Sequence, residues 1–220
     1  MNIMKFIPST IFLFICLNCS SQNNATNKEY FSLGSKTTGI CFGHAKYYNG
    51  LRLNLWDKEL KDEDTSLFQI NGLAISFANE SKVTNGIQIG LVASHTKIIN
   101  GISIASIANN AKKINGIATS FVLNCDTMNG LFLGFGIGPT NGNIDNTILT
   151  GLAIGVLTDI ESSIGIIISL FKQHSKKQRG LSIAALNKAD ELKGLQIGLL
   201  NYAGNNPKLV RWLPFINFHF

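Results

Sequence analysis

The chain has 220 residues, of which 45% are hydrophobic and only 15% are charged, and it carries a formal net charge of +6. This length and hydrophobic content allow a single domain with a sizeable core. From residue 38 onward no run of 18 apolar residues occurs, which excludes a membrane-spanning helix in that part of the chain. The positive mean hydropathy of +0.17 therefore favours β-strands, which need shorter apolar runs.

Residues 1–18 have the features of a secretory signal peptide. Lys5 precedes an apolar run that extends from Phe6 to Leu17, and small polar residues follow it. Cys19, with two serines after it, resembles the lipidation site of bacterial lipoproteins. The match is incomplete, because Cys16 and Asn18 replace the usual leucine and small residue. We expect a lipid on Cys19 that anchors the protein to a membrane, with cleavage near residue 22 as the alternative.

Two further segments complete the predicted domain organisation. Residues 19–37 are polar and lack periodicity, so they are predicted to form a tether. Residues 38–220 are predicted to form a single domain of β-repeats. Within that domain, residues 58–69 are a charged insertion, predicted to be a short helix or an ordered loop.

One short phrase recurs along this domain. Each copy begins with glycine, usually preceded by asparagine, and the steps between glycines are 14 or 15 residues with one exception of 21. Two weaker copies lie near Gly39 and Gly50. The clear copies begin at Gly72, Gly86, Gly101, Gly116, Gly130, Gly151, Gly165, Gly180 and Gly194.

Hydrophobicity alternates within each copy. The first and third residues after the glycine are nearly always Ile or Leu, as at Ile87 and Ile89, and the residues between them are small or uncharged. Period-two alternation is typical of a strand with one buried face. We therefore expect the aliphatic side chains to be buried and the row of Gly, Gln, Ser and Ala to face outward. An apolar pair, such as Leu91 and Val92, is expected at the bend that follows, and charges come after it.

Two all-β architectures are compatible with this repeat. In a parallel β-solenoid with 14–15 residues per coil, every copy occupies the same environment and the asparagines stack in a hydrogen-bonded column. The aromatic C-terminal segment, which contains Trp212, Phe215 and Phe220, would cap such an array. The alternative is an outer-membrane β-barrel of about twelve antiparallel strands, which commonly ends in an aromatic strand. A repeat that recurs once per strand favours the solenoid.

The copy at residues 194–203, GLQIGLLNYA, resembles the repeats of a family of bacterial envelope proteins known as surface-repeat proteins. The resemblance covers roughly residues 70–220. It implies export and a location in the cell envelope, at the outer membrane or cell surface. It implies no catalytic residues.

Few residues indicate chemistry. The four histidines, at positions 44, 95, 174 and 219, lack metal-ligand spacing, and Gly134–Gly138 lacks the helix that a phosphate-binding loop requires. Cys41 and Cys125 are predicted to be free thiols that pack as small apolar side chains. The lysines of residues 172–179 are predicted to form a solvated bend. No catalytic, metal-binding or cofactor-binding residue is predicted, and no nucleic-acid partner is expected.

These observations predict a non-catalytic, exported and lipid-anchored protein with a structural, adhesive or partner-binding role. The alternative is a small integral outer-membrane barrel with a structural or pore role. The row of small residues, Gly, Gln, Ser and Ala, is the candidate contact face, and the sequence does not identify the partner that would bind there.

Overall fold

A computed structural model describes residues 30–35, 37–56, 68–140, 142 and 146–220. In this part of the chain the protein is all-β, with 87% of residues in strands and no α-helix. A single seven-stranded sheet contains all of the strands in chain order, and it is not closed. Residues 1–18, Cys19 and residues 57–67, and with them the predicted signal peptide, lipidation site and most of the charged insertion, lie outside the described residues.

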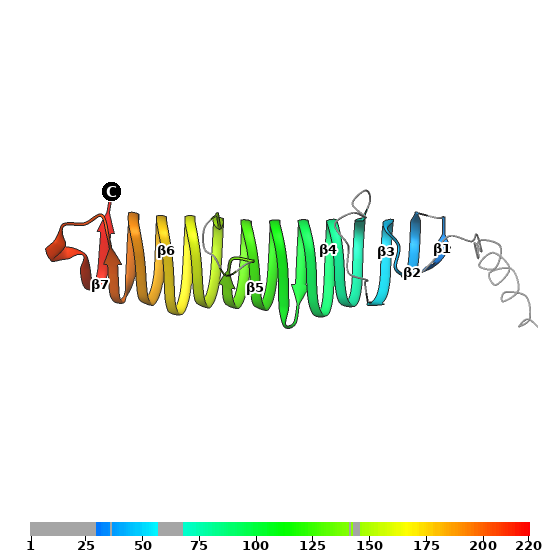
Figure 1. Cartoon of the computed structure of the whole chain (residues 1–220), viewed down its shortest axis with the longest axis horizontal. Coiled ribbons are helices and arrows are strands. Elements are labelled where there is room, and N and C mark those ends of the chain that lie inside the picture. Colours follow the sequence, from blue (N-terminus) through cyan, green and yellow to red (C-terminus); the bar gives the residue numbers. More distant parts are fainter. Residues whose placement is uncertain (1–29, 36, 57–67, 141, 143–145) are drawn as a thin grey trace, which may run out of the picture.

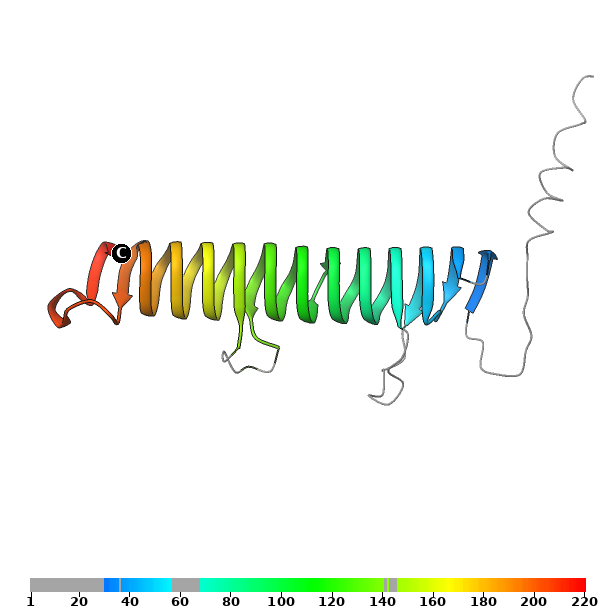
Figure 2. The ribbon, with the colours of Figure 1, turned by 90° about the horizontal axis from the view of Figure 1, so that it is seen from above.

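The strands differ greatly in length. Three of them, β4, β5 and β6, are long enough to wind at least twice around the same axis, so the described part of the molecule is an elongated row of coils (Figures 1 and 2). The elements are β1 (Tyr30–Gly34), β2 (Thr38–Gly43), β3 (Tyr47–Trp56), β4 (Gln69–Ala105), β5 (Ala108–Gly138), β6 (Ile148–Ala203), the 3₁₀ helix η1 (Lys208–Val210) and β7 (Trp212–His219).

From β2 to β6, each strand pairs in parallel with the next one, and the register pairs each leading glycine with another leading glycine. Gly39 pairs with Gly50, Gly101 with Gly116, and the same register joins β5 to β6. Within the long strands each leading glycine also lies against the carbonyl oxygen of the glycine one coil earlier. The alternative prediction of about twelve antiparallel strands closed into a barrel is therefore wrong, because these neighbours run in the same direction and the sheet is open.

Asparagines before the leading glycines form the predicted column. Asn100 donates a hydrogen bond from Nδ2 to Oδ1 of Asn85 at 2.8 Å, and Asn115 donates in the same way to Asn100 at 2.8 Å. The ladder extends from Asn49 to Asn129. It stops there because Thr150 occupies the next place. Each amide along this ladder thus satisfies its neighbour, and the ladder favours parallel stacking over other registers.

Glycine is required where the coils begin. Gly116 has φ +137°, a backbone conformation that residues with a Cβ rarely adopt. A Cβ added at Gly116 would also collide with the backbone of Gly101. Gly101 has the same relation to Gly86, with φ +135°. Both causes act together, since the backbone must have positive φ and must also touch the preceding coil.

The interior is lined by the side chains that were predicted to face outward. Gln88, Ser103 and Ala118 are fully buried, whereas Ile87 and Ile117, which directly precede Gln88 and Ala118, keep 38% and 40% of their surface exposed. The predicted face assignment is therefore wrong. The alternation of the strand is present, but the small side chains point inward because a coil of 14 or 15 residues encloses little space.

Different parts of the interior have different chemistry. The middle is apolar, and its cluster includes Ile114, Leu123, Met128 and Phe132. Toward β3 the interior is polar: Gln88 donates from Nε2 to Ser103 Oγ at 2.9 Å. Further polar bonds follow along this part, such as Thr96 to Gln88 and Asn109 to Ser103. Toward β7 it is polar again, with bonds from Gln196 to Gln178 and from Asn187 to Asn201.

Both ends of the sheet finish with an antiparallel strand. β1 pairs with β2, and β7 pairs with the last coil of β6. β1 lies within residues 19–37, so the last part of the predicted tether belongs to the sheet and the described domain begins at Tyr30. At the other end Asn206 bonds to Asn217, which is fully buried. The aromatic side chains of the C-terminal segment remain exposed, with Phe215 at 70%, so backbone pairing and asparagines cover this end.

Candidate functional site

An uncharged surface runs along one flank of the rod. It consists of the first and third side chains after each leading glycine, which point outward because the second points into the interior. We call each strand segment that carries one such pair a rung. Eleven rungs begin at glycine, from Gly39 to Gly194, and the end strands β1 and β7 add one each, which makes thirteen.

The parallel register aligns these side chains into two columns, which together we call the apolar face. The end strands continue the columns, since Leu33 pairs with Ile40 and Phe218 with Leu195. The first column is Leu33, Ile40, Leu51, Leu73, Ile87, Ile102, Ile117, Leu131, Leu152, Ile166, Leu181, Leu195 and Phe218. The second column is Phe31, Phe42, Leu53, Ile75, Ile89, Ile104, Thr119, Leu133, Ile154, Ile168, Ile183, Ile197 and Ile216.

The apolar face is uniform. Thr119 is its one polar member, and no charged residue belongs to either column. Exposure is similar along most of its length, with 40% at Ile104, 41% at Ile166 and 37% at Ile197, and it is higher in β7, with 52% at Ile216 and 57% at Phe218. Neighbouring side chains in a column cover one another partly, so the surface is continuous.

A second apolar surface adjoins this face at the bend that follows it. We call it the apolar bend, and its side chains are more exposed, with 75% at Leu170 and 65% at Phe171. Phe121 stacks on Phe135 with ring centroids 4.8 Å apart. The sequence predicted a bend at these positions, and the bend places the large side chains outside. The apolar bend comprises Leu55, Phe77, Leu91, Ile107, Phe121, Phe135, Leu170, Phe171, Leu199 and Leu200.

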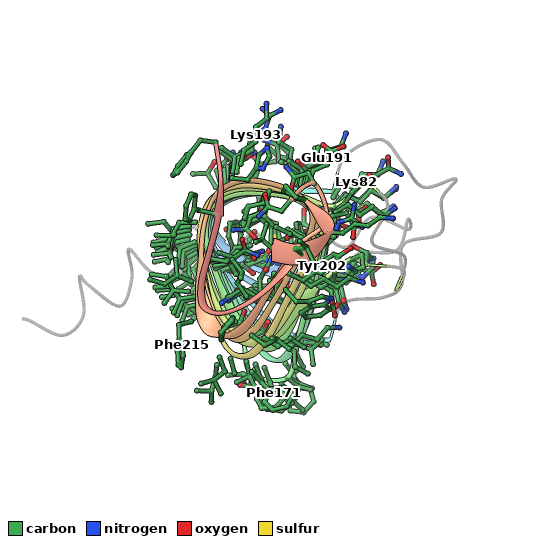
Figure 3. The ribbon with its side chains drawn as sticks, turned by 90° about the vertical axis from the view of Figure 1, so that its left-hand side faces the viewer. Lys82, Phe171, Glu191, Lys193, Tyr202 and Phe215 are labelled. Atoms are coloured by element: carbon green, nitrogen blue, oxygen red, sulfur yellow. The ribbon has the colours of Figure 1, made fainter. Side chains whose placement is uncertain are left out.

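Most of the described charged side chains occupy the remaining sides, and Arg52, which is buried in the interior, is an exception. Viewed along the rod, Lys82, Glu191 and Lys193 lie on the side opposite Phe171, and the flank above Phe215 carries only carbon atoms (Figure 3). The rod is therefore amphipathic in cross-section along its length, with the apolar face and apolar bend together and the charges apart.

No family model, curated protein or solved structure matches this chain. The apolar face is consequently the feature from which a function can be argued.

The residues that the sequence singled out are dispersed. His95 is exposed, His44 stacks on Phe68 with centroids 5.0 Å apart, and His219 bonds to Asn206. Gly134–Gly138 lies in β5 and pairs with β6, so it is part of a strand. Within the described residues no three His, Cys, Asp or Glu side chains gather to hold a metal ion, and no helix is long and apolar enough to span a membrane.

The two described cysteines, Cys41 and Cys125, are buried and are not joined in a disulfide, as predicted. Burial raises the pKa of the Cys125 thiol to about 12. A thiol with so high a pKa stays protonated near neutral pH and is a poor nucleophile. Cys125 therefore contributes packing within the apolar part of the interior.

One ionic cluster lies on the charged side. Asp159 accepts a hydrogen bond from Lys172 Nζ at 3.3 Å and lies 3.5 Å from His174 Nδ1. The hydrogen bond to His174 lowers the pKa of Asp159, burial opposes this shift, and Lys172 adds to the lowering. Lys172 is thus paired within the lysine-rich bend of residues 172–179, which reduces the charge that the bend offers to an anionic partner.

The Asp159 cluster predicts a dependence of stability on pH. Because its folded-state pKa lies below the ordinary value of 3.8, the carboxylate stabilises the fold above that value and ceases to do so as the pH falls through its folded pKa. We expect Asp159→Asn to be less stable than wild type at about pH 5, with the difference shrinking steadily below about pH 4. Urea unfolding across this range measures the difference, and a gap that widens toward acid would contradict the assignment.

Proposed function

We propose that this chain is a non-catalytic, exported protein of the bacterial cell envelope that acts through its apolar face. In this proposal it is a short-repeat parallel β-solenoid with a structural or partner-binding role, and a lipid on Cys19 holds it at the membrane. The observation that carries the proposal is the apolar face, which extends without a charged residue from β1 to β7.

An apolar surface of this size indicates binding. Soluble proteins expose many single apolar side chains, but contiguous patches beyond a few hundred Å² mark interaction sites. Stability alone does not require Ile or Leu at these positions, because the interior is filled by other side chains, such as Ser103 and Ala118. The repetition of the pair in nearly every rung therefore supports a contact function.

The chemistry of the surface supports a non-catalytic role. Aliphatic side chains neither donate nor accept hydrogen bonds, and they carry no group that titrates or attacks a substrate. Such a face binds by excluding water from a complementary apolar surface. Thr119 contributes the one hydroxyl group in the two columns of the apolar face.

The solenoid assignment is supported by register and spacing. From Gly72 to Gly194, seven of the eight steps between leading glycines are 14 or 15 residues, and glycine pairs with glycine wherever one described strand meets the next in parallel. A repeat that stacks on its own neighbour needs several copies before it is stable, which accounts for the length of the array.

Lipid labelling tests the envelope assignment. Bacteria that express the full chain in the presence of labelled palmitate should incorporate the label into the wild-type protein and hold it in the membrane fraction. Cys19→Ala should lose the label, whereas Cys41→Ala, which removes a buried thiol, should keep it. An unlabelled wild-type protein, or a label that persists in Cys19→Ala, would refute the proposed anchor.

A further inference from the structure

We propose that the apolar face binds a second copy of this chain in a face-to-face dimer. The two rods run in opposite directions, and the twofold axis passes between the two Thr119 side chains. This inference names the partner of the face and rests on the contact role proposed for it. Four features carry it: the area, the spacing and the flatness of the face, and the position of its one hydroxyl group.

The area of the face meets the requirement of a stable dimer. The twelve intervals of about 4.8 Å between thirteen rungs give a length of roughly 58 Å, and four residues at about 3.3 Å give a width of roughly 13 Å. Pairing two such faces buries about 1,500 Å² in total, which lies within the range of specific protein–protein interfaces. The chain carries a formal charge of +6, but the face carries no charge, so two copies can meet there without burying like charges.

A second copy also matches the face in spacing. Two sheets pack about 10 Å apart when their side chains interdigitate, and this requires the same distance between strands on both sides. Identical rods meet that requirement over their full length, from β1 to β7. A lipid surface offers apolar contact but has no spacing that would match the rungs.

The shape of the face favours a sheet as its partner. The carbon-only flank stays on one side of the rod in the view along its axis, so the face twists little (Figure 3), and the row of coils is straight in two perpendicular views (Figures 1 and 2). Sheets of many strands normally twist, and flat ones are typically stabilised by stacking on another sheet. A second apolar face supplies that stacking.

Thr119 defines the register and direction of the pair. It lies in the seventh of the thirteen rungs, so rods that run in opposite directions with full overlap bring the two Thr119 side chains together, where their hydroxyl groups can bond to each other. A slip of one rung sets both hydroxyls against aliphatic groups and leaves them without partners, which is unfavourable. With parallel rods each Thr119 would instead face Ile117. A single polar residue fixes register in coiled coils by the same mechanism.

The mass of the protein in detergent-free buffer tests the dimer. The full chain with Cys19→Ala should sediment with the mass of two chains. Adding Ile117→Glu, which places two carboxylates opposite each other at the central rung, should shift the protein to single chains with an unchanged far-UV circular dichroism spectrum. The matched control Ile107→Glu makes the same change at the apolar bend, where Ile107 is 57% exposed, and should leave the dimer intact.

Several results would overturn the inference. They are a single-chain mass for the Cys19→Ala protein, a dimer that survives Ile117→Glu, or equal dissociation by both glutamates. Single chains that sediment with phosphatidylethanolamine–phosphatidylglycerol vesicles, and that lose this binding with Ile117→Glu, would assign the face to lipid instead of a second copy. The outcomes separate from those of the labelling experiment: a lipidated protein without self-association refutes only the inference, and a dimer without lipid refutes only the anchor.

Spin labels test the direction of the rods. Cysteines introduced at Lys193 and, in a separate variant, at Lys113 can be labelled selectively in a chain that also carries Cys16→Ala and Cys19→Ala, because the remaining Cys41 and Cys125 are buried. Opposite directions place the two Lys193 sites ten rungs apart, about 48 Å, and the two Lys113 sites close to the same level. Short distances at both sites would show parallel rods and refute the proposed axis at Thr119.

Discussion

Gly116→Ala is expected to destabilise the whole array by roughly 2–6 kcal/mol, since backbone strain and overpacking act at the same position. Gly116 has φ +137°, and an added Cβ would meet the carbonyl oxygen of Gly101 at a separation that real Cβ atoms do not adopt. Neither atom can move alone, because both belong to hydrogen-bonded backbone of adjacent rungs. Chemical denaturation followed by circular dichroism measures the loss.

Gly136 provides the matched control for this substitution. It lies in β5, has no positive φ, and an added Cβ meets no atom within 4 Å. We expect Gly136→Ala to change the free energy of unfolding by no more than about 0.5 kcal/mol. Equal losses from both variants would mean that glycine is not required by the contact between successive coils.

Ile114→Asp is expected to cost about 3–5 kcal/mol, because it leaves an uncompensated charge in an apolar interior. Ile114 is fully buried and belongs to the cluster that contains Leu123, Met128 and Phe132. The described members of that cluster include no cation, and the thiol of Cys125 is its one weak hydrogen-bond donor, so a carboxylate there would stay uncompensated. Loss of the cooperative unfolding transition, or a large decrease in its midpoint, is the expected measurement.

The same substitution on the outside should be tolerated. Ile107, seven residues earlier in the sequence, is 57% exposed at the apolar bend, and Ile107→Asp should cost less than about 1 kcal/mol. The comparison directly tests which isoleucines form the core. Comparable destabilisation at the two positions would contradict the burial of Ile114 and the exposure of Ile107.

Strands, bends and register were predictable because each follows from local chemistry. The alternation at Ile87 and Ile89 indicates a strand, and the pair Leu91 and Val92 breaks it where the chain turns. The recurrence of asparagine before glycine predicted a column, and the bonds between Asn85, Asn100 and Asn115 confirm it. A repeat with one copy per strand carries this information in every copy.

The face that is buried could not be predicted from alternation alone. A period of two places Ile87 and Gln88 on opposite faces of the strand but does not say which face is buried. Hydrophobicity alone favoured burying the isoleucines. The size of the side chains decides which face is buried. Isoleucines two places before the glycine, Ile99 and Ile114, already fill the narrow interior, so the residues that face them must be small or must bond to each other. The candidate face was consequently assigned to the wrong side of the strand.

The extent of the sheet was also underestimated at its first strand. Tyr30–Gly34 is short and lies among polar residues, so it was included in the tether. Its alternation of Phe31 and Leu33 with Ser32 continues that of the following rungs, but in the opposite direction along the chain. Only the pairing with β2 reveals that this segment belongs to the apolar face.

The antiparallel strands at the two ends of the sheet limit how further chains can be added to the rod. A stack of similar parallel coils can in principle be extended by further chains end to end, as in a parallel amyloid fibre. β1 and β7 are the edge strands, and each is antiparallel to the coil with which it pairs. A further chain added at either edge could therefore not continue the glycine and asparagine columns. The protein thereby keeps a finite length despite being built from units that would otherwise polymerise.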